Sequence, residues 1–200
     1  MNTSTSLATN DTEKSYQPFW FDDALRIEQP ERSEPLRGET SADICIVGGG
    51  YTGLWTAIKI KQQAPEKDVV IVEAGLCGQG ASGRNGGCML TWSTKFPTLM
   101  RLYGLEQAAK LVNASEQAVW QLRDFCQQQG IDAEVRVDGA YYTATNAAQQ
   151  GLLDPVLRLL EQQTINHWQT TDPAELEGVT GSALNLSGIF TPNAGSLHPG

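Results

Sequence analysis

The sequence has few of the residues on which metal and disulfide proteins depend. Its 200 residues include four cysteines and two histidines. No two cysteines have the C-x-x-C spacing of zinc or thiol–disulfide sites. We expect Cys45, Cys77, Cys88 and Cys126 to be reduced thiols. We expect no metal site, because only His167 and His198 could join them as ligands.

Basic charge and long apolar runs are also scarce. Lys and Arg number 14 against 23 Asp and Glu, giving a net charge of −9, so we expect no nucleic acid or anionic membrane as the main partner. No apolar run approaches the ~20 residues that span a bilayer. The N-terminal stretch MNTSTSLATNDTEKSYQ lacks the basic start and apolar centre of a secretory signal. The sequence predicts a cytoplasmic protein with no integral membrane segment.

The first forty residues read as an arm. Residues 1–15 are small and polar and are predicted to be disordered. Residues 15–40 carry prolines and charges, with Phe19, Trp20 and Phe21 near one end. We expect an extended arm whose aromatic side chains dock on the body of the protein, with a loose tail as the alternative.

A strand, a helix and a strand then follow in quick succession. Residues 42–47 (ADICIV) and 68–75 (DVVIVEAG) are short apolar runs, typical of buried parallel strands. Residues 51–63 carry apolar side chains at helical spacing between them. The three segments occupy the ~30 residues of a βαβ unit. The sequence predicts an α/β fold with a Rossmann-like βαβ core.

The turn after the first strand has the dinucleotide-binding pattern G-x-G-x-x-G. Gly48 permits a tight turn, Gly50 lets a pyrophosphate approach the backbone, and Gly53 lets helix and strand pack closely. The N-terminus of the helix supplies free N–H groups to phosphates. Glu73 ends the second strand, about 20 residues beyond Gly53, where an acid bonds the adenosine ribose. A glycine turn that merely joins strand to helix is the alternative.

A second glycine cluster, GQGASGRNGGC at 78–88, distinguishes between two nucleotides. NAD and FAD share the adenosine half, but FAD continues into a ribityl chain and an isoalloxazine ring. A loop along that longer ligand needs small residues, N–H donors and a cation. Ser82, Arg84 and Asn85 stand among such glycines, so the cluster favours FAD. A flexible surface loop is the alternative.

The rest of the chain predicts mixed helices and strands. Apolar residues at helical spacing predict a long helix from about 105 to the stop at Gly130. The other expected elements are a hairpin over 133–145 around Asp138-Gly139, a helix over 146–163 kinked at Pro155, a short helix over 171–181 capped by Asp172 with Pro173 and Glu175 in its first turn, and a loop or edge strand over 188–200.

The segments ADICIVGGGYTGLWTA, VVIVEAG and GASGRNGG together resemble a known family. They are similar to FAD-dependent oxidoreductases of the D-amino-acid oxidase, glycine oxidase and sarcosine oxidase superfamily. With the arm SYQPFW, they most resemble the branch that contains gamma-glutamylputrescine oxidoreductase and aminophosphonate oxidoreductases. The resemblance implies an FAD core interrupted by an inserted α+β substrate domain. Such enzymes are over twice this length, so the chain reads as an incomplete N-terminal part. The expected domains are a partly disordered arm (1–40), the first part of the FAD core (41–94), the start of the substrate domain (95–187) and a truncated return toward the FAD domain (188–200).

The family resemblance also implies an activity. A small primary or secondary amine or amino acid is oxidised to an imine by hydride transfer to flavin N5. The imine is hydrolysed, and oxygen or another acceptor reoxidises the flavin. The catalytic residues are not assigned, and we expect this portion alone to be inactive. The expected cofactor-binding residues are Gly48, Gly50, Tyr51, Thr52, Gly53, Glu73, Ala74, Gly80, Ser82, Arg84, Asn85, Gly86 and Gly87. An NAD-linked dehydrogenase and a non-catalytic FAD-binding sensor or structural protein remain alternatives.

Four further positions leave their roles open. We expect His198 to serve a turn or cap, with a catalytic role as the alternative. Tyr141 and Tyr142 alternate along a strand, so one faces a core and the other a cavity or solvent. Trp92 packs either near the flavin ring or in the core.

Overall fold

The computed structural model describes residues 18–29 and 33–200. The disorder expected for residues 1–15 therefore lies outside the described residues. The chain divides into two compact units, one of residues 1–85 with Pro199 and Gly200, the other of residues 86–198. Because packing alone defines these units, the domain ranges expected above, with a boundary at 94/95, stay predictions.

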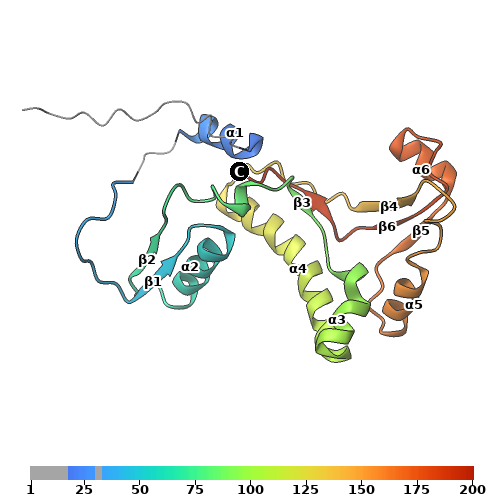
Figure 1. The fold of residues 1–200 in the computed structure, drawn as a ribbon, viewed down its shortest axis with the longest axis horizontal. Coiled ribbons are helices and arrows are strands. Elements are labelled where there is room, and N and C mark those ends of the chain that lie inside the picture. Colours follow the sequence, from blue (N-terminus) through green and yellow to red (C-terminus); the bar gives the residue numbers. More distant parts are fainter. Residues whose placement is uncertain (1–17, 30–32) are drawn as a thin grey trace, which may run out of the picture. The chain divides into compact units, whose positions relative to one another are not determined.

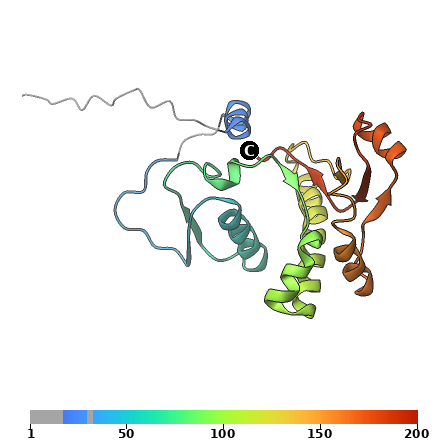
Figure 2. The ribbon, with the colours of Figure 1, turned by 45° about the vertical axis from the view of Figure 1, so that its right-hand side comes forward.

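The first unit contains the expected βαβ arrangement. Strands β1 (Ile44–Val47) and β2 (Val69–Val72) pair in parallel, and helix α2 (Tyr51–Gln63) lies between them in sequence. Figures 1 and 2 both show α2 alongside this pair. The predicted strands and helix are confirmed, but the prediction that the two strands are buried is wrong. Val47 is 85% exposed, because in the described part of this unit α2 is the helix that packs on the pair, whereas a parallel sheet is buried when both faces are covered.

Helix α1 (Phe19–Glu28) occupies part of the expected extended arm. Its first turn carries Asp22 and its last turn carries Arg26, which complements the helix dipole. Arg26 also pairs with Asp23 at 2.6 Å. The extended conformation was therefore wrong for these residues. The docking of the aromatic residues is confirmed for Phe21, which is 5% exposed, whereas Phe19 is 65% exposed.

The second unit is built around the predicted long helix. Helix α4 (Leu105–Gln129) ends at Gly130, whose φ of +67° lies in the left-handed region that favours glycine. Helix α3 (Phe96–Tyr103), which the sequence pattern did not predict, packs beside it (Figures 1 and 2). Two short elements precede α3, namely strand β3 (Cys88–Met89) and the 3₁₀ turn η2 (Ser93–Lys95). Gly104 separates α3 from α4.

The expected hairpin over 133–145 was wrong. Strand β4 (Ala140–Ala144) pairs with β6 (Ser187–Thr191), and β6 also pairs with β5 (Gln169–Thr171), all antiparallel. Residues before Gly139 turn instead toward β7 (Gly195–Ser196), where Arg136 bridges Ser196. The Asp138-Gly139 turn therefore connects a segment that pairs with β7 to a strand, β4, that pairs with β6. Strand β6 is central in its sheet, so the expected loop or edge strand was also wrong there.

Two shorter helices show how proline is placed. Helix α5 (Asp154–Gln162) begins at Asp154 instead of Asn146, and Pro155 lies in its first turn, where no N–H is needed, instead of producing a kink. Helix α6 (Pro173–Thr180) is confirmed with its cap, since the Asp172 carboxylate accepts a bond of 2.9 Å from the Glu175 N–H.

The main core lies on one face of the β4–β6–β5 sheet. Ile189 and Tyr142 pack there with apolar residues of α3, α4 and α5. The opposite face carries Gly188, where an added Cβ would lie 2.9 Å from Leu176 of α6. The two faces of β6 are therefore covered by different helices of the same unit.

Candidate cofactor site

The first glycine cluster forms the turn from β1 to α2. Gly48 has a φ of +103°, and its N–H donates to the carbonyl of Val72 at 2.8 Å. An added Cβ at Gly53 would overlap the Gly48 carbonyl oxygen, whereas one at Gly48 would meet nothing within 4 Å. Gly48 and Gly53 therefore shape the turn itself, and the space beside Gly48 is open to a ligand.

The N-terminus of α2 presents donors at the end of this turn. Gly50 is its N-cap, and Tyr51, Thr52 and Gly53 form its first turn. The Tyr51 N–H donates to the Ser82 hydroxyl at 2.9 Å. Thr52 and Gly53 have no intrahelical acceptor, as in the first turn of any helix. These donors and the positive end of the helix dipole suit a phosphate.

Glu73 lies beside the same turn. Its carboxylate accepts bonds from the Gly49 N–H at 2.7 Å and the Gly75 N–H at 3.0 Å. These two bonds, the Gly49 bond first, hold the pKa of Glu73 below its usual value of 4.5. An ionised carboxylate has about four acceptor positions, so it can brace the turn and still accept from a ribose. Ala74, between Glu73 and Gly75, is exposed.

The second glycine cluster lies against the first. The Gly78 N–H donates to the Gly49 carbonyl at 3.0 Å, and an added Cβ at Gly50 would lie 2.9 Å from the Ser82 hydroxyl. Ser82 belongs to the 3₁₀ turn η1 (Ala81–Gly83). The structure therefore brings both clusters to one place, the N-terminus of α2.

Arg84 follows η1 on the exposed side of the loop. Its Nε donates to the Gln79 carbonyl at 3.2 Å, and its backbone N–H donates to the Ala81 carbonyl at 3.1 Å. Among the described residues, its guanidinium makes no ion pair. The Asn85 side chain donates to the Ser82 carbonyl at 2.6 Å. Within the described part of the chain, Arg84 is thus a cation that is held by hydrogen bonds and makes no ion pair with an acid.

The remaining expected glycines differ in their surroundings. Gly80 is exposed, and an added Cβ there or at Gly86 would meet nothing within 4 Å. Gly87 has a φ of +73°, and its carbonyl accepts from the Leu197 N–H at 2.9 Å. Gly86 and Gly87 fall in the second unit, so the structure groups with the first cluster only the part of the loop up to Asn85.

Sequence reasoning missed the role of the Tyr51 side chain. Its hydroxyl donates to the Pro199 carbonyl at 2.7 Å, while its N–H faces Ser82. The two residues are far apart in sequence, and no motif links them. The sequence also gave no sign that the Glu73 carboxylate would bond the Gly49 N–H.

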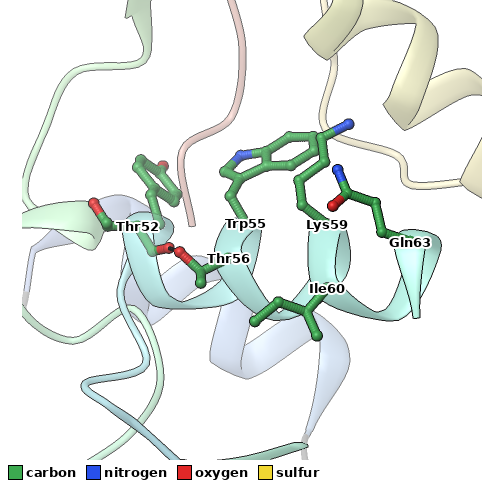
Figure 3. A pocket seen from close by; sticks show the side chains of 7 residues that line it. Thr52, Trp55, Thr56, Lys59, Ile60 and Gln63 are labelled. Carbon is green, nitrogen blue, oxygen red and sulfur yellow. Dashed lines mark hydrogen bonds between the residues drawn. The ribbon is translucent and has the colours of Figure 1, made fainter. Parts of the chain in front are cut away.

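A hollow of about 560 Å³ runs along the side of α2, lined by Tyr51, Thr52, Trp55, Thr56, Lys59, Ile60 and Gln63. Figure 3 shows the Lys59 side chain extending over the Trp55 ring, 5.6 Å from its centroid. The Thr56 hydroxyl bonds the Thr52 carbonyl at 2.6 Å. The hollow follows the flank of the helix, whereas the free N–H groups lie at its end, so the cofactor site is better defined by the glycine turns.

The other residues that the sequence analysis considered lie in the second unit, where each contacts other groups of the protein. His167 bonds Glu116 at 2.6 Å from Nδ1 to Oε2, and burial raises the pKa of Glu116 while His167 opposes the rise. Tyr142 packs against the core, and Tyr141 stacks on Phe190 at 4.8 Å between ring centroids. The Trp92 N–H donates to the Ser115 hydroxyl at 3.0 Å, Trp92 is half exposed, and the His198 N–H donates to the Ala133 carbonyl at 2.7 Å.

The described part of the chain has neither a cluster of metal ligands nor a helix that could span a membrane. Across residues 18–29 and 33–200, no three side chains of His, Cys, Asp or Glu gather as metal ligands. In the same residues, every helix is too short or too polar to cross a bilayer.

Comparisons with known proteins agree with this geometry. The family described as DAO, FAD dependent oxidoreductase, matches residues 43–200. Gamma-glutamylputrescine oxidoreductase of Escherichia coli (strain K12) is 29% identical over 83% of this chain and 38% of its own length. A probable oxidoreductase, OrdL, of Haemophilus influenzae is 27% identical over 82% of this chain and 38% of its own length. The chain thus spans about 38% of the length of these curated relatives.

Solved structures share the fold. Glycine oxidase from Bacillus cereus matches with a TM-score of 0.57 and 19% identity over 80% of this chain and 42% of that one. L-amino acid deaminase from Proteus myxofaciens matches with a TM-score of 0.63 and 19% identity over 84% and 36%. The family model matches residues 43–200, and the structure contains the βαβ unit and the two adjoining glycine clusters. The chain therefore belongs to the FAD-dependent oxidoreductase family.

Proposed function

We propose that the protein holds FAD on the joined glycine clusters of the first unit. The observation that carries the proposal is the bond from the Tyr51 N–H to the Ser82 hydroxyl, since it brings the second loop to the N-terminus of α2. The first turn of α2 would bind the pyrophosphate, with Gly48 and Gly50 leaving room for it. Glu73 and Ala74 would lie at the adenosine ribose.

The second loop would serve the flavin half of the cofactor. Gly80, Ser82, Asn85, Gly86 and Gly87 supply small side chains and backbone donors, and Arg84 supplies the cation. A guanidinium here would favour the negative charge that reduction places on the isoalloxazine ring. Residues 95–187 would then begin the substrate domain, and residues 188–200 would return the chain toward the FAD domain.

The reaction we propose is oxidation of a small amine or amino acid. The bound flavin supplies the hydride acceptor: the carbon beside the nitrogen gives up a hydride, the nitrogen loses a proton, and water converts the resulting imine to a carbonyl compound and an amine or ammonia. Support comes from the family and from the name of the Escherichia coli relative, an oxidoreductase of gamma-glutamylputrescine. The FAD-dependent family argues against the NAD-linked alternative. We propose a cytoplasmic location.

The test is anaerobic mixing of the complete protein carrying this chain with candidate amines and amino acids. We expect a flavin absorbance spectrum that bleaches with at least one substrate and returns when oxygen or another acceptor is added. A flavin spectrum that no amine bleaches would instead support an FAD-binding sensor or structural protein. Protein isolated without flavin, and unable to take up added FAD, would contradict the cofactor assignment.

A further inference from the structure

Phe21 of α1 packs on the second glycine cluster. The side chain is 5% exposed, although it belongs to a helix of the N-terminal arm. An added Cβ at Gly78 would lie 3.5 Å from the Phe21 ring, and one at Gly83 would lie 3.0 Å from it. The ring therefore rests on the two glycine positions of the loop.

These two glycines have a role other than ligand approach. At Gly83, an added Cβ would also lie 2.5 Å from the Gly78 carbonyl oxygen. Gly78 has a φ of +81°, in the left-handed region that favours glycine. Gly78 and Gly83 approach each other closely and form one seat, the surface on which the Phe21 ring packs.

The seat adjoins two of the loop groups that we propose for the cofactor, Ser82 and Arg84. Gly83 lies between Ser82, whose hydroxyl accepts from Tyr51, and Arg84. Gly78 donates to Gly49 in the first cluster. A shift of the seat would therefore move both the Ser82 hydroxyl and the Arg84 guanidinium.

Helix α1 is also held from another side. An added Cβ at Gly200 would lie 3.0 Å from the Ala24 Cβ, and Pro199 accepts a bond from Tyr51 at 2.7 Å. Pro199 and Gly200 thus pack between α1 and the start of α2 within the first unit. These contacts fix the helix that carries Phe21.

We infer that Phe21 is a positioning residue, which holds the second glycine loop in the conformation that binds FAD. The inference rests on the proposed function for its effect on FAD, but the positioning itself does not need a bound cofactor. A side chain from the N-terminal arm would thereby set the affinity for FAD through the loop on which it packs.

The experiment compares Phe21→Ala with Ile27→Ala in the complete protein. Ile27 lies on the same helix and is 72% exposed, so its variant controls for changes in α1. The first measurement is amide hydrogen exchange in the protein without cofactor. We expect Phe21→Ala to speed exchange over residues 78–85 roughly tenfold and Ile27→Ala to leave it unchanged. A rise confined to α1, with the loop still protected, would overturn the inference.

The second measurement is FAD affinity in a double-mutant cycle. We expect Phe21→Ala to weaken FAD on the order of tenfold, with Phe21→Leu restoring much of the loss. Because Phe21 would act through the loop that carries Arg84, the losses from Phe21→Ala and Arg84→Ala should sum to more than the loss in the double variant. Additive losses, or a Phe21→Ala protein that binds FAD like Ile27→Ala, would contradict the inference. A parent protein that binds no FAD would contradict the proposed function, while the exchange result would still decide the positioning.

Discussion

The two units of this chain are held together in different ways. The second unit buries large apolar side chains completely, among them Phe96, Val112 and Leu160. In the described part of the first unit, Phe21 is the large apolar side chain that is buried to a similar degree, and α2 has no buried residue. Its order comes instead from backbone groups at two glycine turns, bonded to one another, to Glu73 and to Ser82.

The difference teaches that the same chain contains a packed core and a set of backbone donors that we propose as the frame for the cofactor. A core is sensitive to lost volume. A frame of backbone donors is sensitive to any side chain that enters the space kept for the ligand. Substitutions in the two units should therefore have separable effects, on unfolding in one and on cofactor binding in the other.

The largest expected effect is loss of the cofactor from Gly50→Val. The branched side chain would contact the Ser82 hydroxyl, since an added Cβ alone lies 2.9 Å from it, and would occupy the pyrophosphate position. We expect the variant to lose FAD while unfolding of the second unit is unchanged, as judged by flavin per chain and by thermal melting. The matched control is Gly178→Ala in α6, where an added Cβ meets nothing within 4 Å. Normal flavin content in Gly50→Val would remove the turn from the site.

The comparison is sharpened from the other side by Leu160→Ala. Leu160 is fully buried in the core of the second unit, and such truncations cost about 2–5 kcal/mol of stability. Denaturant unfolding should show this loss, with FAD affinity of the folded protein changed little. Leu152→Ala, at a position 67% exposed, is the control. Equal losses in both variants would mean that Leu160 is not a core residue.

A smaller effect is expected from Glu73→Ala. Loss of the carboxylate should weaken FAD by roughly ten- to a hundredfold, as for a hydrogen bond to a charged group, and should leave riboflavin binding unchanged, because riboflavin lacks the adenosine ribose. The pKa of Glu73 is lowered in the folded chain. The contribution of its carboxylate to the free energy of unfolding should therefore be complete above pH 4.5 and be lost as the pH falls through the folded pKa. Titration of both ligands by fluorescence tests this, and equal losses for both would contradict the ribose assignment.

The smallest effect is expected from Arg84→Ala. Removing the exposed cation that we propose lies near the ring should lower the flavin reduction potential by about 20 mV, the equivalent of ~1 kcal/mol for a two-electron couple. It should also slow reduction by substrate. Potentiometric titration of variant and parent at matched flavin occupancy is the measurement, with Arg101→Ala in α3 as the control. Coincident potentials would limit the second glycine cluster to the phosphates.

The sequence predicted those parts of the structure whose signals are local. The β1–α2–β2 unit and the Asp172 cap of α6 follow from residues within a few positions of one another. Several failures involve residues far apart in the chain. Strand β4 pairs with β6, over forty residues later, because that pairing completes a core face that includes Tyr142 and Ile189. The Asp138-Gly139 turn gives no sign of this choice.

The candidate site divides in the same way. The motif residues Gly48, Gly50 and Gly53 could be assigned duties from spacing alone. The contacts of Ser82 with Tyr51, and of Phe21 with the second loop, could not, because they depend on how separate segments pack. The helical form of the arm at α1 was missed for a related reason, since its buried residue, Phe21, packs on a glycine loop far along the chain.

The central claim is that the two glycine clusters form one FAD site, and an experimental structure of the complete protein with its cofactor tests it most directly. The account predicts the pyrophosphate at the N–H groups of the first turn of α2, the adenosine ribose at Glu73 and the loop of Ser82 and Arg84 along the flavin half. FAD bound elsewhere, or bound at the first cluster with Arg84 turned away from it, would contradict the account.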